Sequence, residues 1–251
     1  MIFTSSWDDG DRANIRLKNL LNKYDLKGTF YINGDYLADK NNRPEIIEIS
    51  RSQEIGAHTY NHSDLTRVEL KKADEDIKLG KTALEELLNR PIDMFCYPYG
   101  FFNQAVKEMA KKNGFLGART TKRFVFNRPI DFFEFGTTTQ IYPYPFRKKD
   151  AIHYHGPKAV FQPLLANYPA ILKYKLAFNS FFNWFNLSKN LFDYGRKNGE
   201  IFHLWGHSRE IEKYGLWNDL EIFFKYIKNF KEMQYLTNSQ CLKYFNENPA
   251  D

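Results

Sequence analysis

The first ten residues constrain the fold of this chain more than any other stretch. Residues 1–6 have the β-branched and aromatic character of a buried strand, and Asp8, Asp9 and Gly10 follow almost directly. In a continuing strand neighbouring side chains point to opposite faces, so the two carboxylates share one site only if the chain turns, which Gly10 permits. Two like charges this close repel and need a cation or a shared proton. The sequence therefore predicts a strand that ends in a turn carrying two carboxylates.

A second segment, residues 58–62, supplies two imidazoles, His58 and His62. With one carboxylate they make a three-ligand set, which suits zinc or a similar divalent ion and leaves a fourth position for water. Each of the two segments also has a simpler explanation. Asp-Asp-Gly is a common turn sequence, and His-x-x-x-His is commonly two unrelated histidines. Their conjunction favours a metal site.

Strands and helices alternate along most of the chain. After the first strand we expect strands at 28–32, 54–57, 94–97, 115–119, 200–207 and near 233–236, and helices at 13–23, 44–49, 69–88, 104–112, 217–230 and from a cap at Thr237 or Asn238 through Phe245. This alternation predicts an α/β fold with a parallel sheet, either a barrel or a doubly wound sheet. The acidic turn, the histidine pair and residues 97–100 all follow strands, at the end where such enzymes keep their chemistry. No repeat or linker is evident, so we expect a single domain over residues 1–251.

Composition narrows the functional classes. The net charge of +6 favours anionic surroundings, although a basic protein without such a partner explains it as well. Two cysteines, Cys96 and Cys241, provide no disulfide framework, and a reducing compartment fits them. Because a strand occupies the first residues and no apolar run is long enough to span a bilayer, we expect a cytoplasmic protein without a signal peptide.

Residues 119–198 are less regular. Basic and aromatic residues alternate there, which would suit single-stranded nucleic acid, stacking on sugar rings or a packed surface. No nucleic-acid-binding motif is present, so no nucleic-acid partner is expected. Residues 170–185 have a helical apolar period that predicts a helix packed on the core. Lys173 and Lys175 leave contact with a membrane surface or a lipid-linked substrate as the alternative.

Further histidines occur at two places. His153 and His155 lie two residues apart without a nearby carboxylate, which indicates substrate contact or structure rather than a metal. In the strand at 200–207, alternation puts His203, Trp205 and His207 on one side.

Four of these segments resemble the motifs of the polysaccharide deacetylases, the NodB-homology group also called carbohydrate esterase family four. Asp8-Asp9-Gly10 is similar to the end of the first motif, and residues 58–62 fit the second, His-Ser/Thr-x-x-His, at every specified position. Residues 96–100 resemble the third motif, Arg-x-Pro-x-Gly, and residues 204–207 fit the fifth, Leu-x-x-His. The motifs occur in the family's order. The resemblance implies a distorted (β/α) barrel of the NodB-homology type.

The chain departs from the family pattern at two positions. Cys96 stands where the family has an arginine that orients the catalytic aspartate. The fourth motif, Asp-x-x-x-Trp, has no match: the segment that begins at Asp131 has Phe135 at the position where the motif has tryptophan. Loss of the arginine should raise the proton affinity of the base and loosen its aim. Arg119, at the predicted end of the next strand, is our candidate to supply the missing charge.

A divalent ion held by Asp9, His58 and His62 would polarise a carbonyl and lower the pKa of a bound water. Asp8, free of the metal, would then take the proton of that water as general base. The resemblance implies the same division between the two aspartates. Zinc is the expected ion, with cobalt, nickel or manganese as alternatives.

The resemblance also implies that the backbone N–H of Tyr99 would donate to the oxyanion. His207 would protonate the leaving amine. His203 is the rival acid and a candidate substrate contact, because it faces the same way along the strand. Tyr99 and Trp205 are expected to line the acyl pocket or to stack on a sugar, while core packing explains Trp205 equally well.

The expected reaction is removal of an N-acetyl group, or a related acyl group, from an amino sugar. Without an export signal, the expected substrate is a nucleotide-linked or lipid-linked precursor of a surface glycan. A catalytically impaired, glycan-binding relative of the same fold is the alternative, because Cys96 replaces the arginine of the third motif.

Overall fold

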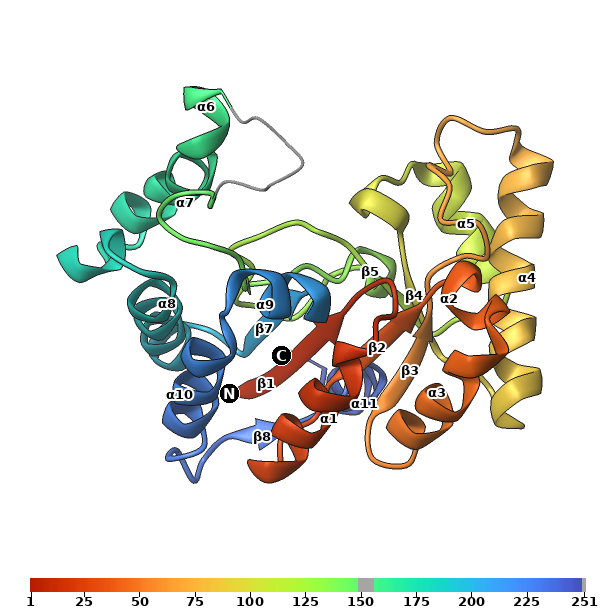
Figure 1. Cartoon of the computed structure of the whole chain (residues 1–251), viewed down its shortest axis with the longest axis horizontal. Helices are drawn as coiled ribbons and strands as arrows, with labels where there is room; N and C mark the ends of the chain where they lie inside the picture. The colour runs from red at the N-terminus through yellow and green to blue at the C-terminus, as the bar shows by residue number, and fades with distance from the viewer. Residues whose placement is uncertain (149–155, 250–251) are drawn as a thin grey trace.

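The computed structural model describes residues 1–148 and 156–249 (Figure 1). Its strands are β1 (Ile2–Trp7), β2 (Thr29–Ile32), β3 (Glu54–Ala57), β4 (Met94–Cys96), β5 (Gly117–Arg119), β6 (Thr139–Gln140), β7 (Ile201–Gly206) and β8 (Gln234–Tyr235). Its α-helices are α1 (Ala13–Lys23), α2 (Gly34–Ala38), α3 (Arg43–Ser50), α4 (Leu70–Leu88), α5 (Gln104–Lys112), α6 (Pro157–Val160), α7 (Gln162–Lys173), α8 (Trp184–Asn198), α9 (Ser208–Tyr214), α10 (Trp217–Ile227) and α11 (Asn238–Glu247). Short 3₁₀ turns are η1 (Lys40–Asn42), η2 (Pro98–Gly100), η3 (Phe132–Glu134) and η4 (Phe178–Phe181).

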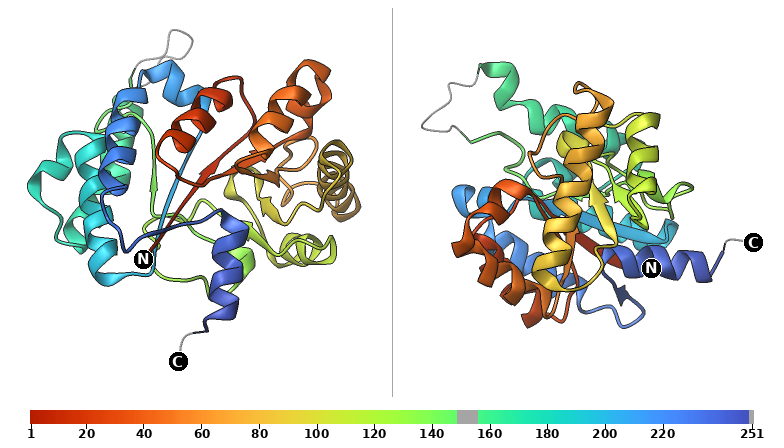
Figure 2. Two further views of the ribbon diagram at one scale, coloured as in Figure 1. Left: turned by 90° about the horizontal axis from the view of Figure 1, so that it is seen from below. Right: turned by 90° about the vertical axis from the view of Figure 1, so that its right-hand side faces the viewer.

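The strands form one curled, parallel sheet in the order β5-β4-β3-β2-β1-β7-β6, with β8 paired to the start of β1. Residues 135–140 link the two edges. Phe135 exchanges backbone hydrogen bonds with Ala118 and Thr120 beside β5, and Thr139 and Gln140 then pair with β7. Helices cover the outside of the sheet (Figure 2). The expected distorted (β/α) barrel is confirmed.

The pleat of β1 separates the two sides of this barrel wall. Phe3 and Trp7 belong to the core cluster beneath the surrounding helices, whereas Ile2 belongs to a separate cluster that includes Tyr31 and Phe135. Ile2 and Phe3 are adjacent in the strand, so their side chains point to opposite faces of the sheet. The second cluster therefore lies on the inner face and fills the barrel interior.

Helix α11 closes the amino-terminal end of the barrel. Thr237 caps it in a complete capping box, as one of the two expected caps. Its first residues contact the starts of neighbouring strands: the Asn238 backbone N–H donates to Thr29 Oγ1 at 2.9 Å, and that of Ser239 donates to Glu54 Oε2 at 3.2 Å. The functional end of the barrel is therefore the opposite one, where the strands finish.

The expected elements are found with small shifts at their ends. The helices at 13–23 and 104–112 and the strand at 54–57 have the expected bounds. Within the described residues, no helix is long and apolar enough to cross a membrane. His153 and His155 lie outside the described residues. The single domain expected over residues 1–251 stays a prediction.

The helix expected over residues 170–185 is wrong. Helix α7 ends at Lys173, Lys175 adopts a left-handed conformation with φ of 50°, and α8 begins only at Trp184. The Asn183 side chain accepts a hydrogen bond from the Asn186 backbone N–H at 2.8 Å, so it caps a new helix where the apolar period had suggested continuity.

Candidate active site

The acidic turn forms as expected at the end of β1. Asp9 and Gly10 have φ of 75° and 85°, so the chain turns where the strand would otherwise send the two carboxylates to opposite faces. The backbone N–H of Asp8 still donates to Gly206 O of β7, at 3.1 Å. Both carboxylates are buried and line one cavity of about 190 Å³.

Helix α4 holds the loop that carries the two histidines. The carboxylate of Asp76 accepts hydrogen bonds from two consecutive backbone N–H groups of the loop, at 2.9 and 2.6 Å. A Cβ on Gly80 would lie 2.5 Å from the Thr59 backbone, so glycine is needed for this close approach. Thr59 and His62 have φ of 60° and 52°, conformations that cost energy and that tertiary contacts must maintain.

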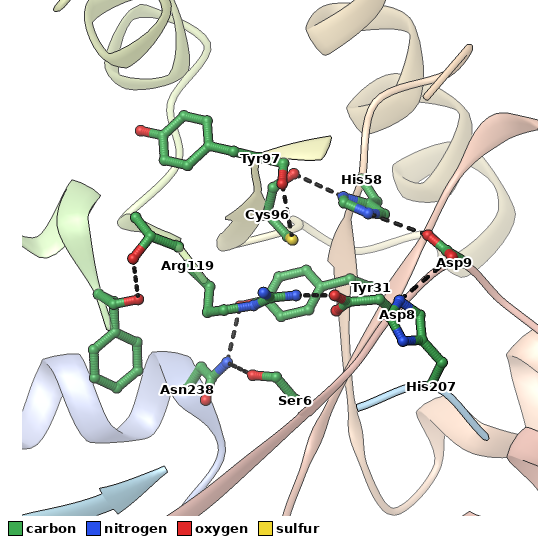
Figure 3. A network of polar contacts seen from close by, with 12 residues as sticks. Ser6, Asp8, Asp9, Tyr31, His58, Cys96, Tyr97, Arg119, His207 and Asn238 are labelled. Carbon is green, nitrogen blue, oxygen red and sulfur yellow. Dashed lines mark hydrogen bonds and ion pairs between the residues drawn. The ribbon is translucent and has the colours of Figure 1, made fainter. Parts of the chain in front are cut away.

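The three expected metal ligands converge on one point (Figure 3 shows Asp9 and His58). Asp9 Oδ1 lies 3.3 Å from His58 Nε2 and 3.2 Å from His62 Nε2, and the two Nε2 atoms are 3.2 Å apart. The other ring nitrogen of His58, Nδ1, lies 2.8 Å from the carbonyl oxygen of Cys96. A carbonyl only accepts, so Nδ1 carries the proton and the Nε2 lone pair faces Asp9.

This donor set fits a divalent cation. Burial by itself raises the pKa of Asp9, but the close contacts with the His58 and His62 rings outweigh it and hold the pKa well below its ordinary value. Two imidazoles and a carboxylate are the ligands that zinc and similar ions prefer. A second potential group, Asp8 with His58 and Cys96, lies within the same span, but an ion pair already engages Asp8.

That ion pair joins Asp8 Oδ2 to Arg119 Nη2, as Figure 3 shows. Arg119 is fully buried, and its guanidinium lies 5.1 Å from the Trp205 ring centroid and 5.4 Å from that of Tyr31. Burial lowers the pKa of Arg119, but the charge of Asp8 raises it further, so the guanidinium stays charged. Asp8 Oδ1 has no hydrogen-bond partner among the described residues.

Strand register explains how Arg119 reaches this place. Cys96 on β4 and Arg119 on β5 are directly paired, so their side chains leave the sheet on the same face. A cation on either strand therefore points into the same part of the barrel. Burial raises the pKa of the Cys96 thiol well above its ordinary value, so it supplies no charge of its own.

His207 follows β7 and faces the same cavity. Its Nε2 lies 3.6 Å from Asp9 Oδ2, and its Nδ1 lies 3.0 Å from Glu210 Oε2 on the first turn of α9. Burial lowers the pKa of His207, but the hydrogen bond to Glu210 and the charge of Asp8 raise it above its ordinary value. Arg209 Nη2 lies 2.6 Å from Asp9 Oδ2 at the open side of the cavity.

Two aromatic side chains form the walls of the cavity. Tyr99 is 57% exposed, has φ of 58° and packs edge-on against His62 with ring centroids 4.8 Å apart. Trp205 is almost fully buried, and its indole N–H has no hydrogen-bond partner among the described residues. Both line the cavity, and their contact with an acyl group or a sugar stays a prediction.

His203 does not line it. Its Nε2 lies 2.6 Å from Ser6 Oγ, its Nδ1 lies 2.8 Å from Gly136 O, and it is fully buried beneath the site. Desolvation, together with the charge of Arg119, lowers the pKa of His203 to about 3. Since both ring nitrogens are engaged and the ring stays neutral, we retain His203 neither as an acid nor as a substrate contact.

Three residues that organise the site were not predicted from the sequence: Arg209, Glu210 and Asp76. Glu210 had a local signal, because it lies three residues after His207 at the start of a helix, where such side chains meet. Arg209, next to it, and Asp76, on a helix far along the chain from His58, had none. Their roles depend on how separate elements pack.

A family model supports the identification that the geometry suggests. Residues 3–118 match the polysaccharide deacetylase family. The resemblance expected from the motifs is thereby confirmed, and the match covers somewhat less than half of the chain.

Curated relatives are distant and match in part. The chain is 26% identical over 114 residues to a chitooligosaccharide deacetylase of Bradyrhizobium, which covers 43% of this chain and 51% of that protein. It is 28% identical over 92 residues to the uncharacterized protein YlxY of Bacillus subtilis, covering 36% of this chain and 28% of that one. The chain thus spans about half, or less, of the length of these relatives.

Solved structures share the fold over the whole chain. A Mycobacterium smegmatis protein assigned to the polysaccharide deacetylases superposes with a TM-score of 0.72 at 14% identity, covering 100% of this chain and 92% of that one. A family 4 acetyl xylan esterase from Clostridium thermocellum, solved with cobalt, gives a TM-score of 0.60 at 13% identity, with coverages of 98% and 92%. A family 4 pseudoenzyme from Bacillus anthracis gives 0.54 at 14%, with coverages of 96% and 65%. At these identities the likeness concerns the fold.

Proposed function

We propose that this chain is a metal-dependent carbohydrate N-deacetylase, a hydrolase that removes an N-acetyl or related acyl group from an amino sugar. The observation that carries the proposal is the convergence of Asp9, His58 and His62 on one point, beside an Asp8 that Arg119 holds apart from them. The family assignment and the chitooligosaccharide deacetylase among the relatives support the reaction class. When bound by these three residues, a divalent cation supplies Lewis-acid polarisation and lowers the pKa of water at the site.

Asp8 is the general base in this mechanism. Its Oδ2 is occupied by Arg119, which leaves Oδ1, buried and without a protein partner in the described chain, to accept a proton from the attacking water. The guanidinium keeps the carboxylate anionic and fixes its direction, which is the task of the family arginine that Cys96 replaces. Arg119 thus acts through Asp8 and is a positioning residue.

His207 is the general acid. The Glu210 carboxylate accepts the Nδ1 proton of the ring, so Nε2 is the nitrogen that faces the cavity and can deliver a proton to the leaving amine. The raised pKa of His207 favours the protonated ring that this step requires.

Tyr99 and Trp205 bind the acyl group and the sugar. The backbone N–H of Tyr99 donates to the oxyanion of the tetrahedral intermediate, as the resemblance implies. The exposed phenol ring of Tyr99 offers a stacking surface for a sugar, and the unpartnered indole N–H of Trp205 offers a donor deeper in the cavity. A nucleotide-linked or lipid-linked amino sugar in the cytoplasm is the proposed substrate.

One observation favours a second candidate, a glycan-binding relative without activity. Cys96 replaces the motif-three arginine, and the pseudoenzyme from Bacillus anthracis is a case in which this fold lacks activity. The complete ligand set and the cation that Arg119 brings to Asp8 favour the enzyme.

Metal analysis together with an acetate-release assay tests the proposal. We expect about one equivalent of divalent metal in the purified protein and acetate release from at least one member of a panel of N-acetylated nucleotide sugars and lipid-linked sugars. Asp8→Asn is the matched control and should keep the metal while losing turnover. Protein that binds no divalent metal after exposure to zinc, cobalt, nickel or manganese would contradict the proposal and favour the binding module.

A further inference from the structure

The positive charge of this chain is concentrated in one segment. Residues 137–192 contain seven lysines and arginines and one acidic residue, Asp150, a balance that equals the net charge of the entire chain, +6. From residue 151 to residue 192 the sequence has no acidic residue at all. Such an asymmetry indicates an anionic partner for this segment.

The same segment exposes a continuous set of large apolar side chains. Four of them recur at helical spacing along one side of α7 and its amino-terminal boundary, and two more lie on the turn that follows. We call the surface formed by Phe161, Leu165, Tyr168, Leu172, Phe178 and Phe182 the α7–η4 face; these side chains are between 44% and 74% exposed. Scattered apolar residues are normal on a protein surface, but a contiguous stripe of this kind is typical of an interaction site.

Lysines flank this face. Lys158, Lys173 and Lys175 are exposed, and none forms an ion pair with a carboxylate of the described residues. The opposite side of α7 is buried, with Ile171 only 2% exposed, so the helix is fixed on the body by one side and presents the other to solvent. An apolar stripe with lysines beside it and no acidic residue is the pattern of a helix that lies in a membrane interface.

The α7–η4 face lies at the same end of the barrel as the cavity. Trp184, the first residue of α8 shortly after η4, donates from Nε1 to Gln140 O at 2.8 Å. Because Gln140 ends β6, this hydrogen bond attaches the face to the carboxyl end of that strand. Arg123, which follows β5, donates from Nη2 to Ala166 O at 3.1 Å and anchors α7 from the other side. In Figure 1, α6 and α7 project away from the barrel. Any larger surface that contacts α6 and α7 would therefore lie on the same side of the molecule as the cavity.

We propose that the α7–η4 face binds an anionic lipid surface, with the apolar side chains in the interfacial region and the lysines among the headgroups. A second copy of the chain is the weaker occupant, because it would bring two strongly positive faces together. The proposed contact is peripheral, with α7 lying along the lipid surface. Resting on the proposed function, this docking would present the cavity to an amino sugar carried by a lipid.

Sedimentation with vesicles tests the docking without any substrate, so its outcome is independent of whether the deacetylase proposal holds. The probes are vesicles of mixed phosphatidylglycerol and phosphatidylcholine, and vesicles of phosphatidylcholine alone. We expect the protein to pellet with the anionic vesicles and not with the neutral ones, and the bound fraction to fall as salt is raised.

Two variants locate the surface. Replacing Leu172, Phe178 and Phe182 by serine should weaken binding to anionic vesicles by roughly tenfold or more, because these side chains lose their apolar area. Replacing Lys158, Lys173 and Lys175 by glutamine should weaken it by on the order of 100-fold, about fivefold for each lysine.

The matched control lies on α4, on another part of the molecule. Lys78→Gln combined with Leu79→Ser removes an exposed lysine and a leucine that is 54% exposed, and should leave vesicle binding unchanged. Circular dichroism and the midpoint of thermal unfolding confirm that each variant is folded. Absence of pelleting, or pelleting that both face variants retain, would overturn the proposal. Self-association that the serine variant abolishes, without vesicle binding, would assign the face to a second copy instead.

Discussion

Charged side chains at the carboxyl end of the barrel face one another, whereas those beside α7 and η4 face solvent. Around the cavity, two carboxylates, an arginine and three histidines meet at the ends of four different strands. All of them are buried except His62 and His207, which are partly exposed. Around the α7–η4 face, lysines stand without carboxylate partners in the described chain, next to exposed aromatic rings. The chemistry proposed for the first region depends on positions held to within about an ångström, whereas the docking proposed for the second depends on summed area and charge.

This difference teaches how each region should respond to mutation. Point substitutions in the cavity should act steeply and individually, because each side chain has one geometric task. Substitutions on the α7–η4 face should act gradually and together, since no single side chain is indispensable.

The two adjacent aspartates should separate metal binding from proton transfer. His62→Ala, which removes one of the three proposed metal ligands, should lose both the divalent metal and turnover. Asp8→Asn should keep the metal and reduce kcat by about 10²–10⁴-fold, because only the base is removed. Metal content and acetate release measured on the same samples check this. If Asp8→Asn also lost the metal, the assignment of Asp9 as ligand and Asp8 as base would be wrong.

Arg119 should matter for turnover and stability but not for metal content. Arg119→Ala leaves a buried Asp8 carboxylate without its partner, which costs about 3–5 kcal/mol of folding free energy in comparable buried pairs. We expect kcat to fall by roughly 100-fold while the metal remains. Arg119→Lys keeps the charge, is less disruptive to the fold, and should restore part of kcat. An alanine variant that is folded and fully active would remove Arg119 from the mechanism.

Strand geometry made the acidic turn and the Arg119 contact predictable. A pleated strand cannot bring Asp8 and Asp9 to one site without a turn, so the sequence alone implied that the chain turns here, although it did not reveal the left-handed backbone at Asp9. Likewise, consecutive parallel strands bring their ends together, so an arginine ending β5 could reach the place of one ending β4. These predictions needed only the order and the ends of the strands.

Packing decided what the sequence left open. The apolar period of residues 170–185 is compatible with a buried face or an exposed one, and nothing local reveals that Phe178 is 74% exposed. The break at Lys175 was also missed, because a non-glycine residue with positive φ has no strong sequence signal. His203 was assigned to the cavity from strand alternation alone, which gives the side of a strand but not the depth in the barrel.

His203 should make folding stability sensitive to acid. Its pKa is lowered to about 3 in the folded protein by desolvation, against an ordinary value of 6.5 in the unfolded chain. Below pH 6.5 the unfolded chain binds a proton that the folded protein does not, so stability falls with decreasing pH until about pH 3. This contribution approaches about 1.4 kcal/mol per pH unit. His203→Gln should therefore show a shallower loss of stability.

Urea unfolding of both proteins, measured in the presence of a chelator so that metal release does not contribute, checks this slope. Equal slopes for wild type and His203→Gln would mean that the buried ring takes up a proton in the folded state. The barrel interior around His203 would then be solvated enough to hold a charge, as the α7–η4 face is, and the difference between the two regions would be smaller than proposed.

Two neighbouring residues of α7 give the smallest and sharpest test of the contrast. Leu172 is 63% exposed and Ile171 is 2% exposed, although both are aliphatic and of similar size. Leu172→Ala should change the free energy of unfolding by less than about 0.5 kcal/mol, whereas Ile171→Ala should cost about 2–5 kcal/mol through lost burial and the cavity it leaves. Chemical denaturation of the two variants measures the difference. A comparable cost at Leu172 would mean that this side chain packs against the protein itself, and the α7–η4 face would then lack the apolar area that docking on a lipid surface requires.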